Sequence, residues 1–442
     1  MSGKIFLVTR NDGLGERLKA MLNAIVLADY FGVDFKIRWR LNPTLTGGGH
    51  CIVAAAATFD PVFIADHCMT NPDLTRFVTL KPLGLPLEDI RKLLDSAPDG
   101  IIVNQEAIER LVTGLDDLPG RLKDAWRRID FASDLRDEMA RAATIPLPPN
   151  AVALHLRAGD MIYGNFRLFD SYTHKALCYP VAKHIIEERL AAGQTPVIFG
   201  QDVPTCRLLA GKFGLKLASD LLDLTDDLGT ALAEIVLMSR CAQIYAGVSG
   251  FSRVAELIGG GKIITPAGES AASVVDVIAS DPDLYDPEVP LSGPQRAFAF
   301  YNLVHYGRDV VAPESLIEAL DCALFYDRGN AFYAILKAMY ETEVGKLDDA
   351  ERTLCDMLSV SLQDDVDFKE TTVRRVIKNA FGGYQRTSKM NLRPYLESLS
   401  RQPQYDRPST LFIGQLARLA AEKGEGFEDE QAVRQQRVAQ YA

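Results

Sequence analysis

Residues 5–39 decide the fold class, and they read IFLVTRNDGLGERLKAMLNAIVLADYFGVDFKIRW. A strand-like run at the start is followed by a loop that contains two glycines, and apolar residues then recur at helical spacing from Leu18 to Ala28. A second strand-like run covers 33–39. This strand, loop, helix and strand form a βαβ opening, which favours a parallel sheet with helices on both faces. The sequence therefore predicts an α/β protein.

A second series of the same kind begins at Val152 and continues to Thr265. Three prolines between Ile145 and Asn150 predict a stiff linker ahead of it. We therefore predict two Rossmann-like domains, 1–148 and 149–290, with the carboxyl ends of both sheets facing a cleft.

Helical patterns dominate the third predicted domain, 291–442. Residues 331–357 resemble a tetratricopeptide (TPR) helix pair with its turn at Gly345. A plain helical bundle is the alternative, because a single unit is weak support for a repeat array. We also expect this region to be where a protein partner could dock.

Composition excludes several classes of function. The 442 residues carry 48 Lys and Arg against 59 Asp and Glu, a net charge of −11. This balance argues against binding to nucleic acid through a chain-wide positive field. No apolar run reaches the 18 to 20 or so residues that span a bilayer, and the N-terminus lacks the pattern of a secretory signal. We therefore expect a cytoplasmic protein that does not cross a membrane.

The sharpest motif is His155-Leu-Arg157-Ala-Gly159-Asp160, at the carboxyl end of the first predicted strand of the second domain. Ligands bind at this end of the strands in such sheets. Arg157 suits a diphosphate because its guanidinium is permanently charged and can form two parallel hydrogen bonds. The alternative is a surface Arg-Asp pair beside a core histidine.

A second motif, residues 247–256, is another turn from a strand into a helix, with the sequence GVSGFSRVAE. Small residues and hydroxyls at a helix N-terminus can bind a phosphate, because free backbone N-H groups and the helix dipole meet there. Ser249 or Ser252 could equally serve only as the N-cap of the helix.

Together these motifs resemble the fucosyltransferase superfamily, which includes α-1,2-, α-1,6- and protein O-fucosyltransferases. The resemblance rests on His155 to Asp160, then 199–202, 237–241 and 249–252 in that order, and it covers roughly residues 1–265. The segment 250–256 is most similar to the α-1,6 branch, which includes bacterial nodulation enzymes. That branch has paired arginines where this chain has Arg157 followed by Ala158.

The resemblance implies a GT-B fold and a transferase that inverts the configuration of the transferred sugar. The donor would be a GDP-sugar, with GDP-fucose as the leading candidate, and no metal ion or other cofactor would be needed. The donor would bind to the second domain and a glycan or glycolipid acceptor to the first. Arg157 would bind the β-phosphate and Asp202 the nucleoside. The remaining residues that the resemblance implies for the donor are His155, Ser249, Gly250, Phe251 and Ser252.

The N-terminal loop, residues 10–17, is similar to the Gly-x-Gly loop of the same family, in which it faces the donor. Gly13 and Gly15 would therefore also bind the donor. Leu18 replaces the third glycine of a dinucleotide fingerprint, which argues against a nicotinamide-dependent enzyme.

The catalytic base has several candidates. An inverting transfer needs a base within reach of the acceptor hydroxyl, and Asp12, Glu16 and Asp160 are the carboxylates on the predicted loops. The alternative reading of these residues is a helix-start carboxylate or a partner of an arginine. Arg157 would stabilise the leaving diphosphate.

Two D-x-D sequences, Asp281-Pro-Asp283 and Asp365-Val-Asp367, could in principle hold a divalent metal. We expect both to lie in solvated loops, and we predict no metal site. A non-catalytic binding module that acts through its helical tail is the second hypothesis for the whole chain.

Overall fold

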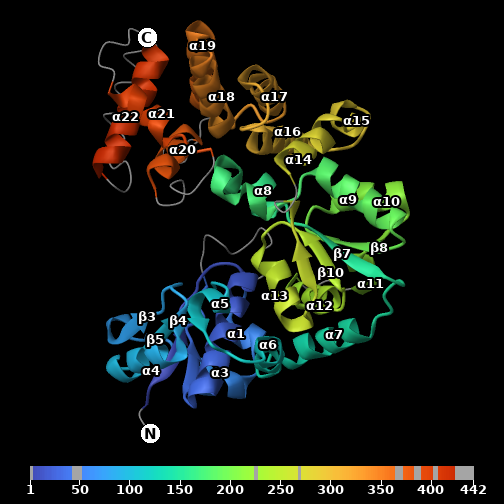
Figure 1. The fold of residues 1–442 in the computed structure, drawn as a ribbon, viewed down its shortest axis with the longest axis vertical. Coiled ribbons are helices and arrows are strands. Elements are labelled where there is room, and N and C mark those ends of the chain that lie inside the picture. The colour runs from blue at the N-terminus through green and yellow to red at the C-terminus, as the bar shows by residue number, and fades with distance from the viewer. Residues whose placement is uncertain are drawn as a thin grey trace. The chain divides into compact units, whose positions relative to one another are not determined.

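The computed structural model describes residues 3–41, 52–222, 227–266, 270–363, 372–382, 390–401 and 407–423 (Figure 1). The chain divides into two compact units. Unit 1 contains Met1–Leu156, Ile186–Gln201 and Leu209–Thr265, and unit 2 contains Arg157–Ile185, Asp202–Leu208 and Pro266–Ala442. Both large sheets belong to unit 1, so the linker predicted at 145–150 lies inside a unit. The division into three domains stays a prediction.

The first sheet has four parallel strands in the order β2-β1-β5-β3. Its central strand β1 pairs with β2 from Ile5↔Asp34 to Val8↔Ile37, and with β5 on its other side. The sequence analysis missed β3 and β5. Its strands are β1 (Ile5–Val8), β2 (Asp34–Ile37), β3 (Phe77–Thr79) and β5 (Gly100–Val103), and β4 (Leu85–Pro86) pairs with β6 (Val112–Thr113) in a separate small sheet.

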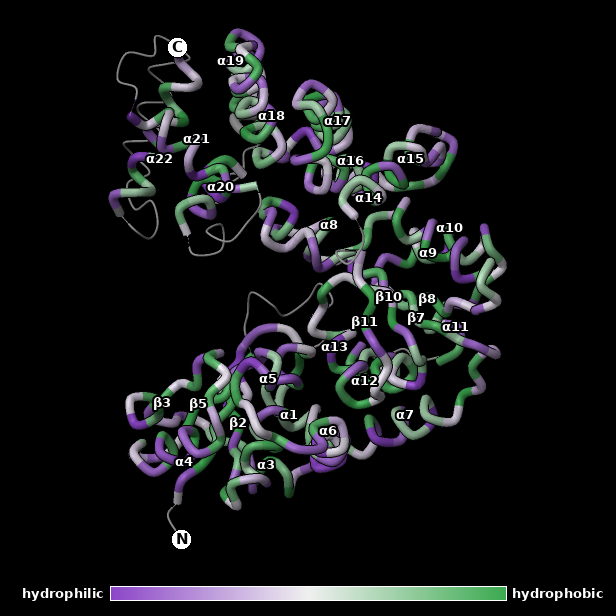
Figure 2. Tube along the Cα trace, viewed as in Figure 1, coloured by the Kyte–Doolittle hydropathy of each residue, from purple (hydrophilic) through white to green (hydrophobic). Residues whose placement is uncertain are grey.

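The second sheet has five parallel strands in the order β11-β10-β7-β8-β9. Figure 2 shows hydrophobic stretches along β7 and β8, as expected for parallel strands that are covered on both faces. The strands are β7 (Ala151–Leu156), β8 (Thr195–Gly200), β9 (Lys216–Leu217), β10 (Gln243–Ala246) and β11 (Lys262–Ile264). The predicted α/β class, with parallel sheets, is therefore confirmed.

Helices connect these strands and form the rest of the described chain. Those of the first 266 residues are α1 (Leu14–Phe31), α2 (Ala55–Thr58), α3 (Pro61–His67), η1 (Leu74–Arg76), α4 (Leu87–Ser96), α5 (Ile108–Leu111), α6 (Leu118–Arg127), α7 (Ser133–Thr144), α8 (Gly159–Ile162), η2 (Asn165–Leu168), η3 (Asp170–Lys175), α9 (Tyr179–Ala191), α10 (Val203–Phe213), α11 (Ala218–Leu222), α12 (Asp227–Ser239) and α13 (Gly250–Gly259).

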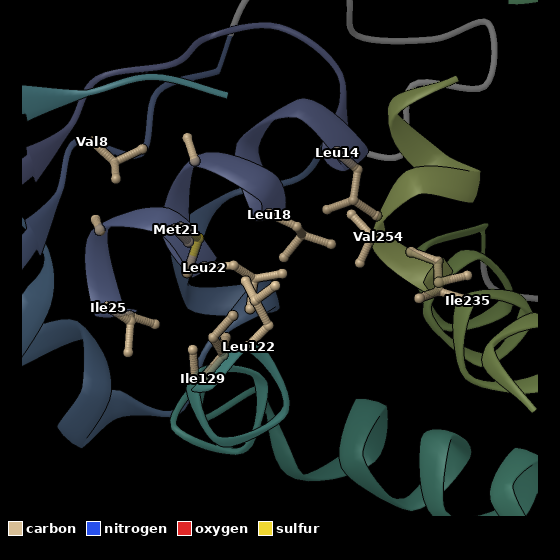
Figure 3. Packing of buried hydrophobic residues seen from close by; sticks show 14 of the residues in the cluster. Val8, Leu14, Leu18, Met21, Leu22, Ile25, Leu122, Ile129, Ile235 and Val254 are labelled. Atoms are coloured by element: carbon tan, nitrogen blue, oxygen red, sulfur yellow. The ribbon is translucent and has the colours of Figure 1, made fainter. Parts of the chain in front are cut away.

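The core of unit 1 is shared by the helices of both sheets. Leu14 and Leu18 of α1 lie beside Val254 of α13 and Ile235 of α12, all of them fully or almost fully buried (Figure 3). Burying side chains of this size contributes about 1.5–3 kcal/mol each. Helices α1 and α13 therefore pack directly on each other.

The described C-terminal region is helical, and all of it belongs to unit 2. Helices α16 and α17 pack together, as do α18 and α19, which are joined at Gly345 (φ +80°). The helix pair predicted over 331–357 is thus present, whereas its identity as a TPR unit stays a prediction. These helices are α14 (Ala271–Ala279), α15 (Pro282–Tyr285), α16 (Gly293–Gly307), α17 (Pro313–Tyr326), α18 (Ala331–Glu343), α19 (Leu347–Gln363), α20 (Thr372–Phe381), α21 (Arg393–Ser400) and α22 (Pro408–Lys423).

Candidate functional site

The register of the second sheet brings the predicted motifs to one edge. His155 pairs with Ala246 of β10 on one side and with Phe199 of β8 on the other. Because the strands are parallel, the segments that follow β7, β8 and β10 all leave from the same edge. These segments begin with Arg157, Gln201 and Gly247. The carboxyl edge of such a sheet is where ligands bind.

His155 connects the first and the last of these motifs. Its side chain is buried, and its ring lies 5.3 Å from the ring of Phe251, centroid to centroid, at an interplanar angle of 33°. Phe251 belongs to the first turn of α13. The contact between these two rings therefore connects the end of β7 to the start of α13.

Both serines of the second motif shape the start of α13. The Ser249 hydroxyl accepts a hydrogen bond from the backbone N-H of Phe251 at 3.3 Å, which is the geometry of an N-cap. Ser252 is fully buried, and its hydroxyl donates to the Ser249 carbonyl oxygen at 3.2 Å. The N-cap reading of Ser249 is therefore confirmed, and its role in donor binding stays a prediction.

The turn that leads into α13 also contacts the N-terminal loop, residues 10–17. A Cβ added at Gly15 would lie 2.5 Å from both the carbonyl carbon of Gly250 and the amide nitrogen of Phe251. A Cβ added at Gly250 would clash with the carboxylate of Glu16. The two glycine-containing turns that the sequence analysis singled out, residues 10–17 and 247–256, are therefore in backbone contact.

The three candidate bases have defined partners. Glu16 accepts from the Lys19 ammonium at 3.1 Å and lies against the first residue of α13, where a carboxylate is favoured by the helix dipole. Asp12 is paired with Arg10. Asp160 accepts from Nη2 of Arg157 through both oxygens, at 3.0 and 3.1 Å. None of these contacts assigns the base, which stays a prediction.

The loop after β7 bends sharply. Gly159 has a φ of +23°, a region that favours glycine, and it begins the short helix α8. The Arg157–Asp160 pair bridges this bend, and both side chains keep part of their surface exposed, 22% and 16%. The guanidinium is thus held against the first turn of α8.

Gly13 is the N-cap residue of α1. Its carbonyl oxygen accepts from the backbone N-H groups of Glu16 and Arg17, at 3.1 and 3.2 Å. Its contact with a donor stays a prediction.

Asp202 accepts hydrogen bonds from several donors in unit 2. Its Oδ2 accepts from the Tyr163 hydroxyl at 2.5 Å, from Nε2 of Gln295 at 2.6 Å and from Oγ1 of Thr205 at 2.7 Å. Its Oδ1 accepts from the backbone N-H of Thr205 at 3.3 Å. Burial, followed by the bond to Asp202, raises the pKa of Tyr163 to about 12. The carboxylate predicted to hold the nucleoside is thus held by the protein itself.

A second buried carboxylate, Asp170, was not predicted. Its Oδ1 accepts from the Tyr301 hydroxyl and from Nδ1 of His305 at 2.6 Å, and its Oδ2 accepts from the backbone N-H of Met390 at 3.2 Å. Burial and the nearby carboxylate hold the pKa of Tyr301 well above its usual range. No sequence signal could have found this cluster, because its donors lie 131 to 220 positions from Asp170.

The expectation that Asp281 and Asp283 lie in a solvated loop is wrong. Both are buried, and the Lys183 ammonium lies 2.7 Å from Asp281 Oδ1 and 3.0 Å from Asp283 Oδ2. The Tyr179 hydroxyl donates to Asp283 at 2.8 Å. Their pairing with an ammonium on α9 replaces the water that a surface loop would supply. Asp365 and Asp367 lie outside the described residues.

The structure also bears on metal binding and on the membrane. Within the described ranges, no group of three or more His, Cys, Asp or Glu side chains is placed to hold a metal ion. No helix in that part of the chain is both long enough and apolar enough to cross a membrane.

Comparison with known proteins gives matches only among solved structures, since no family model and no curated protein matches the chain. The fucosyltransferase NodZ from Bradyrhizobium is 17% identical, with 60% of this chain and 97% of that chain covered and a TM-score of 0.37. NodZ α-1,6-fucosyltransferase soaked with GDP-fucose is also 17% identical, with 58% and 92% covered and a TM-score of 0.35. POFUT1 in complex with GDP-fucose is 10% identical, with 59% and 96% covered and a TM-score of 0.32. The first two of these structures are of a fucosyltransferase.

Proposed function

We propose that the protein is an inverting glycosyltransferase that takes its sugar from a GDP-sugar, GDP-fucose first among the candidates, and uses no metal ion. The acceptor would be a hydroxyl group of a glycan or glycolipid. The observation that carries the proposal is the register of β7, which places the ends of three motif-bearing strands at one sheet edge.

The chemistry of this edge suits the departure of a nucleoside diphosphate. As the bond between the sugar and the β-phosphate breaks, negative charge grows on the phosphate, and preorganised cations and N-H groups stabilise it. Arg157, the residue that follows β7 in the chain, supplies a guanidinium. The N-terminus of α13 supplies a positive dipole end at the neighbouring strand.

The positioning of Arg157 also favours this role. A single nitrogen, Nη2, contacts Asp160 in the described pair. A guanidinium carries five N-H donors in a plane, a geometry that suits bidentate contact with phosphate oxygens. Asp160 would then be a positioning residue for Arg157 as well as a candidate base.

The experiment that tests the donor is a ligand panel on the full chain. GDP, GDP-fucose, GDP-mannose, UDP and NAD are added to wild-type protein, with EDTA or with Mg²⁺, and the melting temperature is measured. A ligand at 100 times its dissociation constant adds about 2.7 kcal/mol, which shifts the melting temperature by a few degrees. We expect a shift with GDP ligands only, which EDTA leaves unchanged.

Two arginine variants make the test specific. Arg157→Ala should abolish the GDP shift, whereas Arg127→Ala on α6, a surface arginine whose side chain is 74% exposed, should leave it intact. Sugar transfer to a glycan acceptor, with the anomeric configuration read by NMR, then tests inversion. Folded protein that gives no shift with any GDP ligand would refute the proposal and favour the non-catalytic binding module.

A further inference from the structure

Arg17 is a buried cation in the first turn of α1. Its side chain is only 1% exposed, and its Nε donates to the carbonyl oxygen of Asp12 at 2.7 Å. The centre of its guanidinium lies 4.7 Å from the centroid of the Trp39 ring. Arg17 therefore reaches from α1 to the carboxyl edge of the first sheet, where Asp12 follows β1 and Trp39 follows β2.

The two terminal nitrogens of Arg17, Nη1 and Nη2, are buried and have no hydrogen-bond partner in the part of the chain that the structure describes. The ring of Trp39 covers a face of the guanidinium, but N-H groups donate in its plane, so the ring does not replace an acceptor. A buried charge without such partners destabilises a protein by several kcal/mol. Burial lowers the pKa of Arg17 to about 10, so it remains charged at neutral pH.

Two further polar atoms at the carboxyl edge of the first sheet also lack a hydrogen-bond partner within the described ranges. Nε of Arg38, the residue after β2, and Oε1 of Gln105, two residues after β5, are buried and have no partner among the described residues. The backbone N-H of Arg38 donates to the Val8 carbonyl oxygen at 2.8 Å, so Arg38 lies beside the end of β1. Two strand ends, those of β2 and β5, thus each present an unsatisfied group, and the first turn of α1, which follows β1, presents the third.

No described aspartate or glutamate forms an ion pair with Arg17 or Arg38. Two other arginines of this edge have side-chain partners, since Arg10 is paired with Asp12 and Arg40 donates to the side chain of Asn71 at 3.0 Å. Native proteins rarely leave several buried polar groups unsatisfied in one place, and a missing ligand is a recurring reason. The missing group must carry oxygen acceptors for two guanidinium groups.

We propose that the carboxyl edge of the first sheet is an anion-binding site, in which Arg17 and Arg38 bind a carboxylate or a phosphate and Gln105 accepts from a ligand hydroxyl. Together these groups fit an acidic, hydroxyl-rich ligand such as a uronic-acid or phosphorylated sugar. This proposal rests on the proposed function, because it makes the acceptor of the transferase an acidic glycan. Bidentate contact with arginine distinguishes such an acceptor from a neutral one.

The test measures binding of glucuronate and of inorganic phosphate to the full chain by calorimetry, at constant ionic strength set with chloride. Arg17→Met is compared with wild type and with Arg40→Met, an exposed arginine of the same edge. We expect Arg17→Met to weaken the binding of at least one anion tenfold or more. We also expect it to keep or raise the melting temperature of the ligand-free protein, because it removes an unpaired buried charge. Arg40→Met should change neither quantity.

A second variant and a second ligand complete the experiment. Arg38→Gln should also weaken anion binding, and GDP binding is measured in the same variants. Loss of GDP binding together with anion binding in Arg17→Met would assign the site to the donor diphosphate, whereas loss of anion binding alone assigns it to the acceptor. Wild-type protein that binds GDP but neither anion would overturn this inference and leave the proposed function standing. A large drop in the melting temperature of Arg17→Met, with anion binding unchanged, would also overturn the inference. Binding of an anion without any GDP binding would instead refute the proposed donor.

Discussion

Gly15 and Gly250 meet backbone to backbone, and neither position has space for a methyl group. A Cβ at Gly15 would lie 2.5 Å from the Gly250 carbonyl carbon, and one at Gly250 would meet the Glu16 carboxylate. This contact brings the N-terminal turns of α1 and α13 together. Two loops that the sequence suggested as separate ligand contacts are thus also a packing interface.

Gly15→Ala should therefore lower the free energy of unfolding by about 1–3 kcal/mol, because the new methyl group overpacks a contact made by rigid backbone. The matched control is Gly211→Ala, in the interior of α10, where an added Cβ meets nothing within 4 Å. That control should stabilise the protein by about 0.5–1 kcal/mol. Urea unfolding of both variants measures the difference, and equal effects would show that the close approach of α1 and α13 is not maintained in solution.

Asp202→Asn should destabilise the protein by about 1.5–3 kcal/mol, because the charged acceptor of three side-chain donors is replaced by an amide. Asp356→Asn, on the exposed surface of α19, should stay within about 0.5 kcal/mol of wild type. Chemical unfolding measures both. If Asp202→Asn were as stable as wild type and only GDP binding fell, the carboxylate would serve the ligand alone and not the fold.

A chain that ends at Ala279 should fail to form a native tertiary structure. It lacks Tyr301 and His305, which donate to Asp170, and Gln295, which donates to Asp202. A buried carboxylate without its donors costs several kcal/mol. Near-ultraviolet circular dichroism and the cooperativity of urea unfolding report the loss, with a chain ending at Lys423, which retains every contact described above, as the control. A cooperative transition in the shorter chain would show that the helical region is a separable module.

The stability of the protein should depend on Glu234 between pH 5 and pH 8. Burial raises the pKa of this α12 carboxyl to about 8, whereas it is about 4.5 in the unfolded chain. In this window the folded state binds more protons than the unfolded state, so the free energy of unfolding falls as pH rises, by at most about 1.4 kcal/mol per pH unit. Well below pH 4.5 and well above pH 8 the contribution is constant.

Glu234→Gln removes this titration. The difference in unfolding free energy between wild type and Glu234→Gln should change across pH 5–8, and the variant should be the more stable protein at pH 8. Glu288→Gln, on the exposed surface, serves as the control with no such change. A wild-type protein whose stability runs parallel to that of Glu234→Gln over this range would contradict the assigned burial of the carboxyl.

The sequence by itself determined the α/β class and the strands β1, β2, β7 and β10, because strand and helix periodicities are local properties of the chain. It also determined where Arg157, Asp202 and Ser249 lie, since the end of a strand is visible in the pattern of apolar residues. It missed β3 and β5, which are only three and four residues long, and β5 begins with a glycine directly after Asp99.

Only the tertiary structure decided what these residues touch. Gln295 and His305 of α16 donate to Asp202 and Asp170 from 93 and 135 positions away, and Lys183 forms ion pairs with two aspartates that the local sequence suggested were exposed. The two unsatisfied nitrogens of Arg17 could not be predicted either, because whether a cation is paired depends on which strand ends meet beside it. Hydrogen bonds and ion pairs act over a few ångströms in space and carry no fixed spacing in sequence, and for this reason the partners had to be found in the folded chain.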